Sequence, residues 1–181
     1  MKSPRPRLPE MPDMHGQPIA IRFLPSLSAH RGKLLSNRGQ GMQIHAGSFV
    51  HRREIVFDAA LASHPGEWNR IFVHECFHFV WVRLGNRRRR SFEEAIAGEL
   101  RRRARGELGW SAEWRKRALK QQDGVVRSRA WREYVCESFC DTAAWLLAEG
   151  GPHEEFTLAS RFREARKRWF EDEGLHKRIR V

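Results

Sequence analysis

The sequence lacks the features that mark several specialised classes of protein. It holds only three cysteines in 181 residues. This small, odd number argues against a disulfide scaffold and predicts a reduced, cytoplasmic protein. No run of eighteen apolar residues occurs, so we expect neither a transmembrane helix nor a membrane partner. The opening stretch MKSPRPRLPEMPDMHG contains no apolar segment of the kind that a secretory signal needs.

Acidic residues are also scarce relative to basic ones. The chain carries 34 lysines and arginines against 22 acidic residues, which gives a net charge of +12, and arginine runs occupy 87–90 and 101–105. Such an excess attracts nucleic acid or acidic proteins. No sequence signature of a nucleic-acid-binding module accompanies it, so a solvated basic surface is the simpler interpretation and nucleic acid is a second candidate partner.

Proline and the hydrophobic pattern divide the chain. Five of the eight prolines lie in the first 18 residues, which predicts a flexible N-terminal tail over 1–17. Residues 18–181 are enough for one domain with its own core. Alternating apolar residues predict strands, of which the last two would pair as a hairpin. The strands are expected over 18–24, 42–50 and 53–61, with two helical turns over 26–35.

Helical patterns dominate after residue 61. The first expected helix begins near Pro65 and ends at Gly85. A second is expected to begin at Ser91, where Glu94 would complete a capping box. Strands followed by helices indicate an α+β fold. The remaining helices are expected over 111–121, 128–149 and 152–174.

The first of these helices contains a metal-binding pattern in apolar surroundings. The segment IFVHECFHFVW, residues 71–81, places His74 and His78 one turn apart, so that both imidazoles share one face. Glu75 lies beside them, and burial of a carboxylate without a partner is costly. Zinc bound by the two histidines would remove that cost, with Glu75 acting on the metal-bound water. The alternative is a pair of core histidines satisfied by hydrogen bonds.

A third ligand is expected from the helix over 128–149, because catalytic zinc usually has three protein ligands. Its carboxylates Glu133, Glu137 and Asp141 recur every four residues and form one stripe. Acids stacked on one face repel one another, and a zinc–histidine site would supply the positive charge opposite them. The alternative is a half-exposed acidic stripe neutralised by arginines.

HECFH followed by ESFCD resembles the gluzincin branch of the zincin metallopeptidases. The resemblance implies His74, His78 and Glu137 as zinc ligands, Glu75 as general base, and Asp141 as the carboxylate that supports His74. It also implies a zincin-like fold, in which an N-terminal twisted mixed sheet precedes the active-site helix and a helical lower half.

In that family an edge strand lines the cleft and pairs with extended peptide, and QIHAGSFV is its expected counterpart here. An Arg-rich helical insert over 87–122 separates HExxH from Glu137. The insert makes Glu93 and Glu94 rival ligands, although both have local roles at the start of their own expected helix.

A further donor to the oxyanion is expected in such a site. Tyr134, one turn before Glu137, is a candidate, and plain core packing is its alternative. The cysteines form no Cys-x2-Cys knuckle, so all three are expected to be small core residues. Other candidate donors are His51, His64 and His153.

These observations predict a zinc metallopeptidase, a hydrolase that cuts peptide bonds of a peptide or protein substrate by a zinc-activated water. The alternative is a non-catalytic zincin-like module whose basic surface binds nucleic acid or an acidic protein. The intact Glu75 favours the first prediction, since a structural zinc site does not need it. The arginine runs favour the second.

Overall fold

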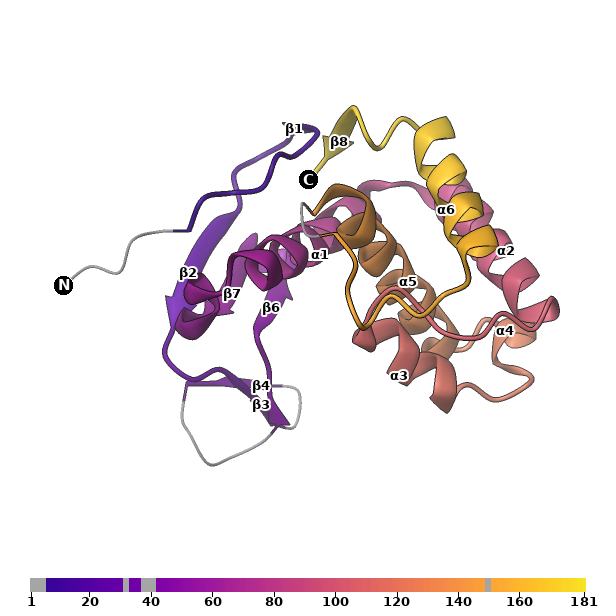
Figure 1. The fold of residues 1–181 in the computed structure, drawn as a ribbon, viewed down its shortest axis with the longest axis horizontal. Coiled ribbons are helices and arrows are strands. Elements are labelled where there is room, and N and C mark those ends of the chain that lie inside the picture. Colours follow the sequence, from indigo (N-terminus) through magenta and orange to yellow (C-terminus); the bar gives the residue numbers. More distant parts are fainter. Residues whose placement is uncertain (1–5, 31–32, 37–41, 149–150) are drawn as a thin grey trace.

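The computed structural model describes residues 6–30, 33–36, 42–148 and 151–181. Within these ranges the chain forms an α+β fold with small mixed sheets and six α-helices (Figure 1). The predicted order of strands first and helices afterwards is confirmed, except for one short C-terminal strand. The helices are α1 (Pro65–Arg83), α2 (Asn86–Arg101), α3 (Trp110–Ala118), α4 (Asp123–Val126), α5 (Arg129–Leu147) and α6 (Ser160–Asp172).

Three small sheets hold the strands. The sheet beside the first helix has the order β2-β7-β6, with β2 and β7 parallel and β6 antiparallel to β7. The other two sheets are the pair β1-β8 and the order β4-β3-β5. The strands are β1 (Asp13–His15), β2 (Ala20–Leu24), β3 (Ser28–His30), β4 (Lys33–Leu35), β5 (Met42–Gln43), β6 (Ala46–Phe49), β7 (Glu54–Asp58) and β8 (Arg178–Arg180).

The predicted hairpin is present as β6 and β7. A 3-10 turn over Val50–Arg52 joins the two strands, and Ser48 lies opposite Ile55 in their register. The central strand β7 is buried, with Ile55 and Phe57 fully inaccessible. Among the described residues, β6 pairs on one side only, so it is an edge strand as the sequence predicted.

Helices α1 and α5 form the centre of the molecule. Apolar residues surround α1 on all sides, which predicts a buried helix, and α1 packs against both α5 and β6. The helix stops before Gly85, whose φ of +81° suits a residue without a side chain. The hydroxyl of Ser128 caps α5 by accepting a hydrogen bond from the backbone N–H of Trp131.

The predicted capping box at Ser91 and Glu94 is wrong. Helix α2 begins five residues earlier, at Asn86, because the arginine run that follows has good helix propensity and continues the helix. Ser91 therefore lies inside α2, where its hydroxyl accepts a hydrogen bond from Trp169 Nε1 at 3.0 Å.

The final helix begins later than predicted, at Ser160 rather than near Pro152. The segment before it is held by the backbone carbonyl of Glu107, which accepts hydrogen bonds from the N–H groups of Thr157 and Leu158. These bonds fix an irregular path over residues that could otherwise have extended the helix.

Two further expectations differ from the structure. Residues 26–35 contain the short antiparallel strands β3 and β4 instead of helical turns. The region expected to be a free tail, 1–17, is docked where it is described. Strand β1 pairs in parallel with β8, so that segments near the two termini lie side by side (Figure 1). The carbonyl of Arg7 also accepts a hydrogen bond from Trp68 Nε1.

A buried ion network ties the helical half together. Arg166 of α6 donates to Glu99 of α2 and to Glu107, at 2.7 Å and 2.9 Å. Glu107 also accepts from Lys116 and from the hydroxyl of Tyr134. Burial raises the pKa of Glu107, but the charges of Arg166 and Lys116 outweigh burial and lower it.

In the described part of the chain, no helix is long and apolar enough to cross a membrane.

Candidate metal centre

Packing of α1 against α5 brings the two sequence motifs together. His74 and His78 reach α5 from α1, while Glu137 and Asp141 reach α1 from α5. The side chains of His74, Glu137 and Asp141 are 12%, 13% and 3% exposed. A cluster of charged groups this deeply buried needs internal compensation of its charges.

The imidazole of His74 lies between two carboxylates. Its Nδ1 lies 2.7 Å from Asp141 Oδ1, and its Nε2 lies 3.2 Å from Glu137 Oε2. Because an ionised carboxylate only accepts hydrogen bonds, Nδ1 carries a proton and Nε2 faces a second acceptor. Burial lowers the pKa of His74, but Asp141 and Glu137 outweigh burial and raise it well above its usual value. A proton or a metal ion bound to Nε2 would make its contact with the Glu137 carboxylate attractive.

Glu137 has a second partner from the arginine-rich insert. Its Oε1 lies 3.2 Å from Nη2 of Arg115 on α3. Burial raises the pKa of Glu137, but His74, His78 and Arg115 together lower it to about 2. Sequence reasoning missed Arg115, because nothing in its spacing relates it to a residue on another helix.

The predicted acidic stripe divides into two parts. Glu137 and Asp141 face the histidines, whereas Glu133 pairs with Arg129 at 2.6 Å on the exposed side of α5. The side chain of Glu133 is 46% exposed, so arginine neutralisation accounts for this one member of the stripe.

A pair of thiols contacts the second histidine. His78 Nδ1 lies 3.5 Å from Cys140 Sγ and 3.7 Å from Cys136 Sγ, and its Nε2 has no partner among the described residues. Burial lowers the pKa of His78, but Cys136 and the nearby carboxylates raise it to about 9. A hydrogen bond from Cys140, together with His78, lowers the pKa of Cys136 to about 6. Sequence reasoning treated these cysteines as core residues, although their i and i+4 spacing was a signal.

Glu75 is buried and held by the edge strand. Its Oε2 lies 2.5 Å from the hydroxyl of Ser48 on β6, and the same hydroxyl lies 2.9 Å from the Glu75 carbonyl. Glu75 is 8% exposed and lines a cleft together with His74. Ser48, another residue that sequence reasoning missed, therefore fixes the carboxylate expected to move protons.

Asp141 is fixed on both of its oxygens. While Oδ1 contacts His74, Oδ2 accepts a hydrogen bond from the backbone N–H of Ala112 in the first turn of α3, at 3.1 Å. Gly109 leaves the space for this carboxylate, because a Cβ at Gly109 would lie 2.3 Å from Asp141 Cγ. The arginine-rich insert therefore contributes a backbone donor as well as Arg115 to the site.

The structure does not bring Tyr134 to the histidines as an oxyanion donor. Tyr134 is fully buried, and its hydroxyl donates to Glu107 Oε1 at 2.5 Å. Burial and the negative charge of Glu107 raise the pKa of Tyr134 well above its usual value. Tyr134 lies outside the lining of the cleft, and its role is structural, in accordance with the alternative of core packing.

The other predicted candidates also have partners elsewhere. His153 pairs with Glu67 at 2.7 Å, and His64 Nδ1 contacts the carbonyl of Ala60. The rival ligand Glu93 pairs with Arg127 at 2.7 Å and accepts from Trp131 Nε1. Neither His51, a candidate oxyanion donor, nor Glu94, the other rival ligand, lines the cleft.

The donor atoms include a group that could hold a metal ion. The 3.2 Å between His74 Nε2 and Glu137 Oε2 is the distance of an ion pair, and it is also close to the separation of about 3.3 Å between two ligands of a tetrahedral zinc. His74, His78 and Cys140 also offer three ligand atoms within 4.8 Å of one another. Glu137 is not a member of this group: among the described residues it contacts His74, whereas the thiol of Cys140 is the third ligand atom within reach of both histidines.

A cleft of about 460 Å3 opens beside these groups. Residues 42–46, which lead into the edge strand β6, form one side. Ile71, His74 and Glu75 of α1 and Trp110 of α3 also line it. His45 is part of this lining, and it is exposed. The cleft thus combines one candidate metal ligand, His74, and the carboxylate of Glu75 with apolar contact surface and an edge strand.

Comparison of the chain with known protein families, curated proteins and solved structures found no match.

Proposed function

We propose that the protein is a zinc-dependent metallopeptidase of the gluzincin type, with His74, His78 and Glu137 as zinc ligands. The observation that carries this proposal is the position of His74, with Nδ1 on Asp141 and Nε2 facing Glu137 at 3.2 Å. A carboxylate on the far nitrogen is the usual support of a zinc-bound histidine. The zincin-like arrangement of sheet and helices is part of the same proposal.

Glu75 acts as the general base. Zinc, when bound, lowers the pKa of a water molecule and polarises the peptide carbonyl. Glu75 accepts the proton of that water and passes it to the leaving amine. The hydroxyl of Ser48 keeps the carboxylate of Glu75 in place. His45 replaces Tyr134 as the candidate donor to the oxyanion, because it lines the cleft and Tyr134 does not.

The identity of the third ligand separates two versions of the site. Glu137, which contacts His74, and Cys140, which contacts His78, are the two candidates. Cobalt substitution distinguishes them, because a thiolate ligand adds a sulfur-to-metal charge-transfer band in the near ultraviolet. We expect no such band, and we expect Glu137→Ala to lower zinc affinity more than Cys140→Ser does.

The cleft supports an extended peptide as the substrate. Exposed backbone of an edge strand can pair with a peptide strand, and β6 is such a strand beside the candidate centre. Ile71 and Trp110, which is 52% exposed, supply apolar contact near Glu75. We therefore expect a preference for an apolar side chain next to the cut bond. The three cysteines are free thiols, which agrees with a cytoplasmic location as part of the proposal.

The direct test is hydrolysis of a fluorescence-quenched peptide library by zinc-loaded protein. Glu75→Gln should lower the rate by about 10²-fold or more with zinc content unchanged. Glu94→Gln, which removes an exposed carboxylate on α2, is the matched control and should leave the rate unchanged. If zinc-loaded protein cuts no peptide, or if Glu75→Gln cuts as fast as the unchanged protein, the non-catalytic module becomes the better account.

A further inference from the structure

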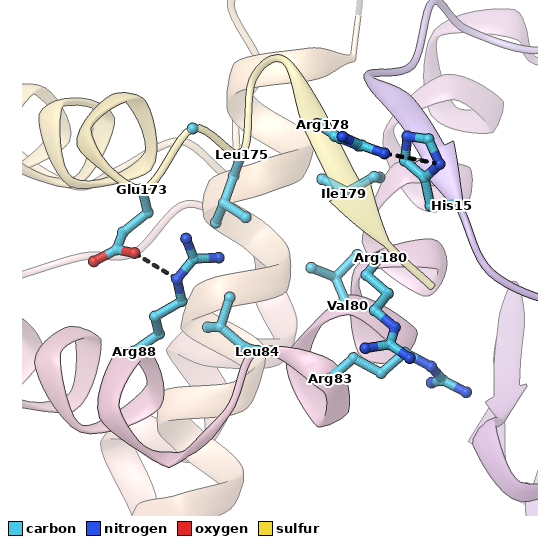
Figure 2. A pocket seen from close by; sticks show the side chains of 11 residues that line it. His15, Val80, Arg83, Leu84, Arg88, Glu173, Leu175, Arg178, Ile179 and Arg180 are labelled. Carbon is cyan, nitrogen blue, oxygen red and sulfur yellow. Dashed lines mark hydrogen bonds and ion pairs between the residues drawn. The ribbon is translucent and has the colours of Figure 1, made fainter.

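A second pocket lies at the C-terminal end of α1. It shares no lining residue with the cleft. It has a volume of about 430 Å3. The last turn of α1, the first turn of α2, the segment after α6 and strand β8 surround it (Figure 2). His15 of β1 completes the wall, so the pairing of β1 with β8 helps to build this pocket.

Four arginines line the pocket. Arg83 comes from α1, Arg88 from α2, and Arg178 and Arg180 from β8. The one acid in the lining, Glu173, already pairs with Arg88 at 2.7 Å (Figure 2). Three guanidinium groups therefore remain without a carboxylate partner among the described residues, and the lining has a large positive excess.

The contacts of these three arginines leave donors available. Arg178 Nη2 lies 3.4 Å from His15 Nδ1, and Nη1 of Arg83 donates to the carbonyl of Phe79 at 3.2 Å. The guanidinium group of Arg180 makes no hydrogen bond to a described residue. Burial lowers the pKa of Arg83, and the like charges of Arg53 and Arg180 lower it further. The fold thus brings together cations that repel one another.

The floor of the pocket is apolar. Val80 of α1 and Leu84, which follows that helix, lie there with Leu175 and Ile179 (Figure 2), and each is less than a tenth exposed. A buried apolar floor fixes the backbone of three elements from which the arginines extend. Arg178 and Arg180 are exposed and Arg83 is partly buried, so the side chains of this cationic rim are accessible to a ligand while their backbone is fixed by the apolar floor.

We propose that this pocket binds a phosphate group, held by Arg83, Arg178 and Arg180. Guanidinium groups match phosphate oxygens with paired hydrogen bonds, and three cations without a carboxylate partner suit a multiply charged anion better than a single carboxylate. The phosphate comes from a small phosphorylated molecule or from a nucleic-acid strand, and the net charge of +12 would draw either one to the site. The proposal does not depend on zinc or on peptidase activity.

The test compares two double variants that remove the same charge. Arg178→Gln/Arg180→Gln alters the pocket. Arg101→Gln/Arg105→Gln alters exposed residues at and beyond the far end of α2, where Arg101 lies about 20 Å from Arg88 by helix rise. Binding of pyrophosphate is measured by calorimetry, and binding of a fluorescein-labelled single-stranded oligonucleotide by anisotropy at several salt concentrations. Arg83→Gln is a second pocket variant on another element, and circular dichroism checks folding of each.

We expect the pocket variants to weaken binding about tenfold or more, and the control double variant to change it less than twofold. Binding of pyrophosphate alone would assign the pocket to small phosphorylated molecules. Binding of the oligonucleotide, with a salt slope that falls by about 1.4 in the pocket double variant, would assign it to nucleic acid. The proposal is overturned if neither probe binds, or if both double variants weaken binding equally, since the effect would then be diffuse charge.

Discussion

Replacement of Asp141 by asparagine tests how much the negative charge of Asp141 contributes to holding His74. The amide keeps an oxygen that can accept from His74 Nδ1, so the tautomer of His74 is retained while the negative charge disappears. The other end of the amide then presents an NH2 group to the backbone N–H of Ala112, which now donates to Asp141 Oδ2 at 3.1 Å. One hydrogen bond is therefore lost and one is weakened.

The expected magnitudes follow from these two contacts. Loss of a carboxylate behind a zinc-bound histidine lowers metal affinity about 10–100-fold, which corresponds to about 1.4–2.7 kcal/mol. The unpaired N–H of Ala112 costs about 1–3 kcal/mol of folding free energy, because Asp141 is buried at 2% exposure. Zinc affinity and stability should therefore both fall.

Competition with a chromophoric chelator measures zinc affinity, and urea unfolding of the zinc-free protein measures stability. Glu133→Gln is the matched control, since Glu133 lies on the same helix but pairs with Arg129 at the surface. It should change both quantities little. If Asp141→Asn bound zinc as tightly as the unchanged protein, Asp141 would not support a metal ligand, and the proposed role of His74 would fail with it.

Three further predictions concern the surroundings of the site. Ser48→Ala should lower the peptidase rate with zinc content unchanged, because Glu75 loses the hydroxyl 2.5 Å away; a rate equal to that of the unchanged protein would remove Ser48 from the proposal. Gly109→Ala should lower zinc affinity and melting temperature, because the added Cβ would lie 2.3 Å from Asp141 Cγ; an unchanged melting temperature would contradict the close approach. The pKa of Glu107 is lowered from 4.5 on folding. The ionised Glu107 therefore contributes its full share to the free energy of unfolding above pH 4.5, and this contribution is lost as the pH falls below 4.5. Glu107→Gln should therefore be less stable at neutral pH and should lose this part of the acid dependence, as urea unfolding at several pH values would reveal.

Local patterns were sufficient to predict the elements that carry the candidate ligands. The apolar surroundings of His74 and His78 predicted a buried helix, and Pro65 and Gly85 gave its limits closely. The i and i+4 spacing of Glu137 and Asp141 predicted that both acids would share a face. Their proximity to His74 agrees with what the resemblance implied, although the binding of zinc stays a prediction.

The partners of these residues could not be predicted in the same way. Ser48 and Arg115 reach the site from a strand and a helix far away in the sequence, and such contacts leave no periodic signal. The capping-box pattern at Ser91 gave a wrong start for α2. The local signal was present, but the arginines before Ser91 extended the helix toward its N-terminus. Tyr134 could be placed only after the ion network around Glu107 was known.

The most direct test of the central claim is the metal content of the protein, measured by elemental mass spectrometry on material purified without added metal or a histidine tag. The proposed centre predicts about one zinc per chain, and less than that in His74→Ala and His78→Ala. Protein that contains no metal, takes up none when zinc is added and gains no stability from it would contradict the proposal. His74, Glu75 and His78 would then be a hydrogen-bonded core cluster.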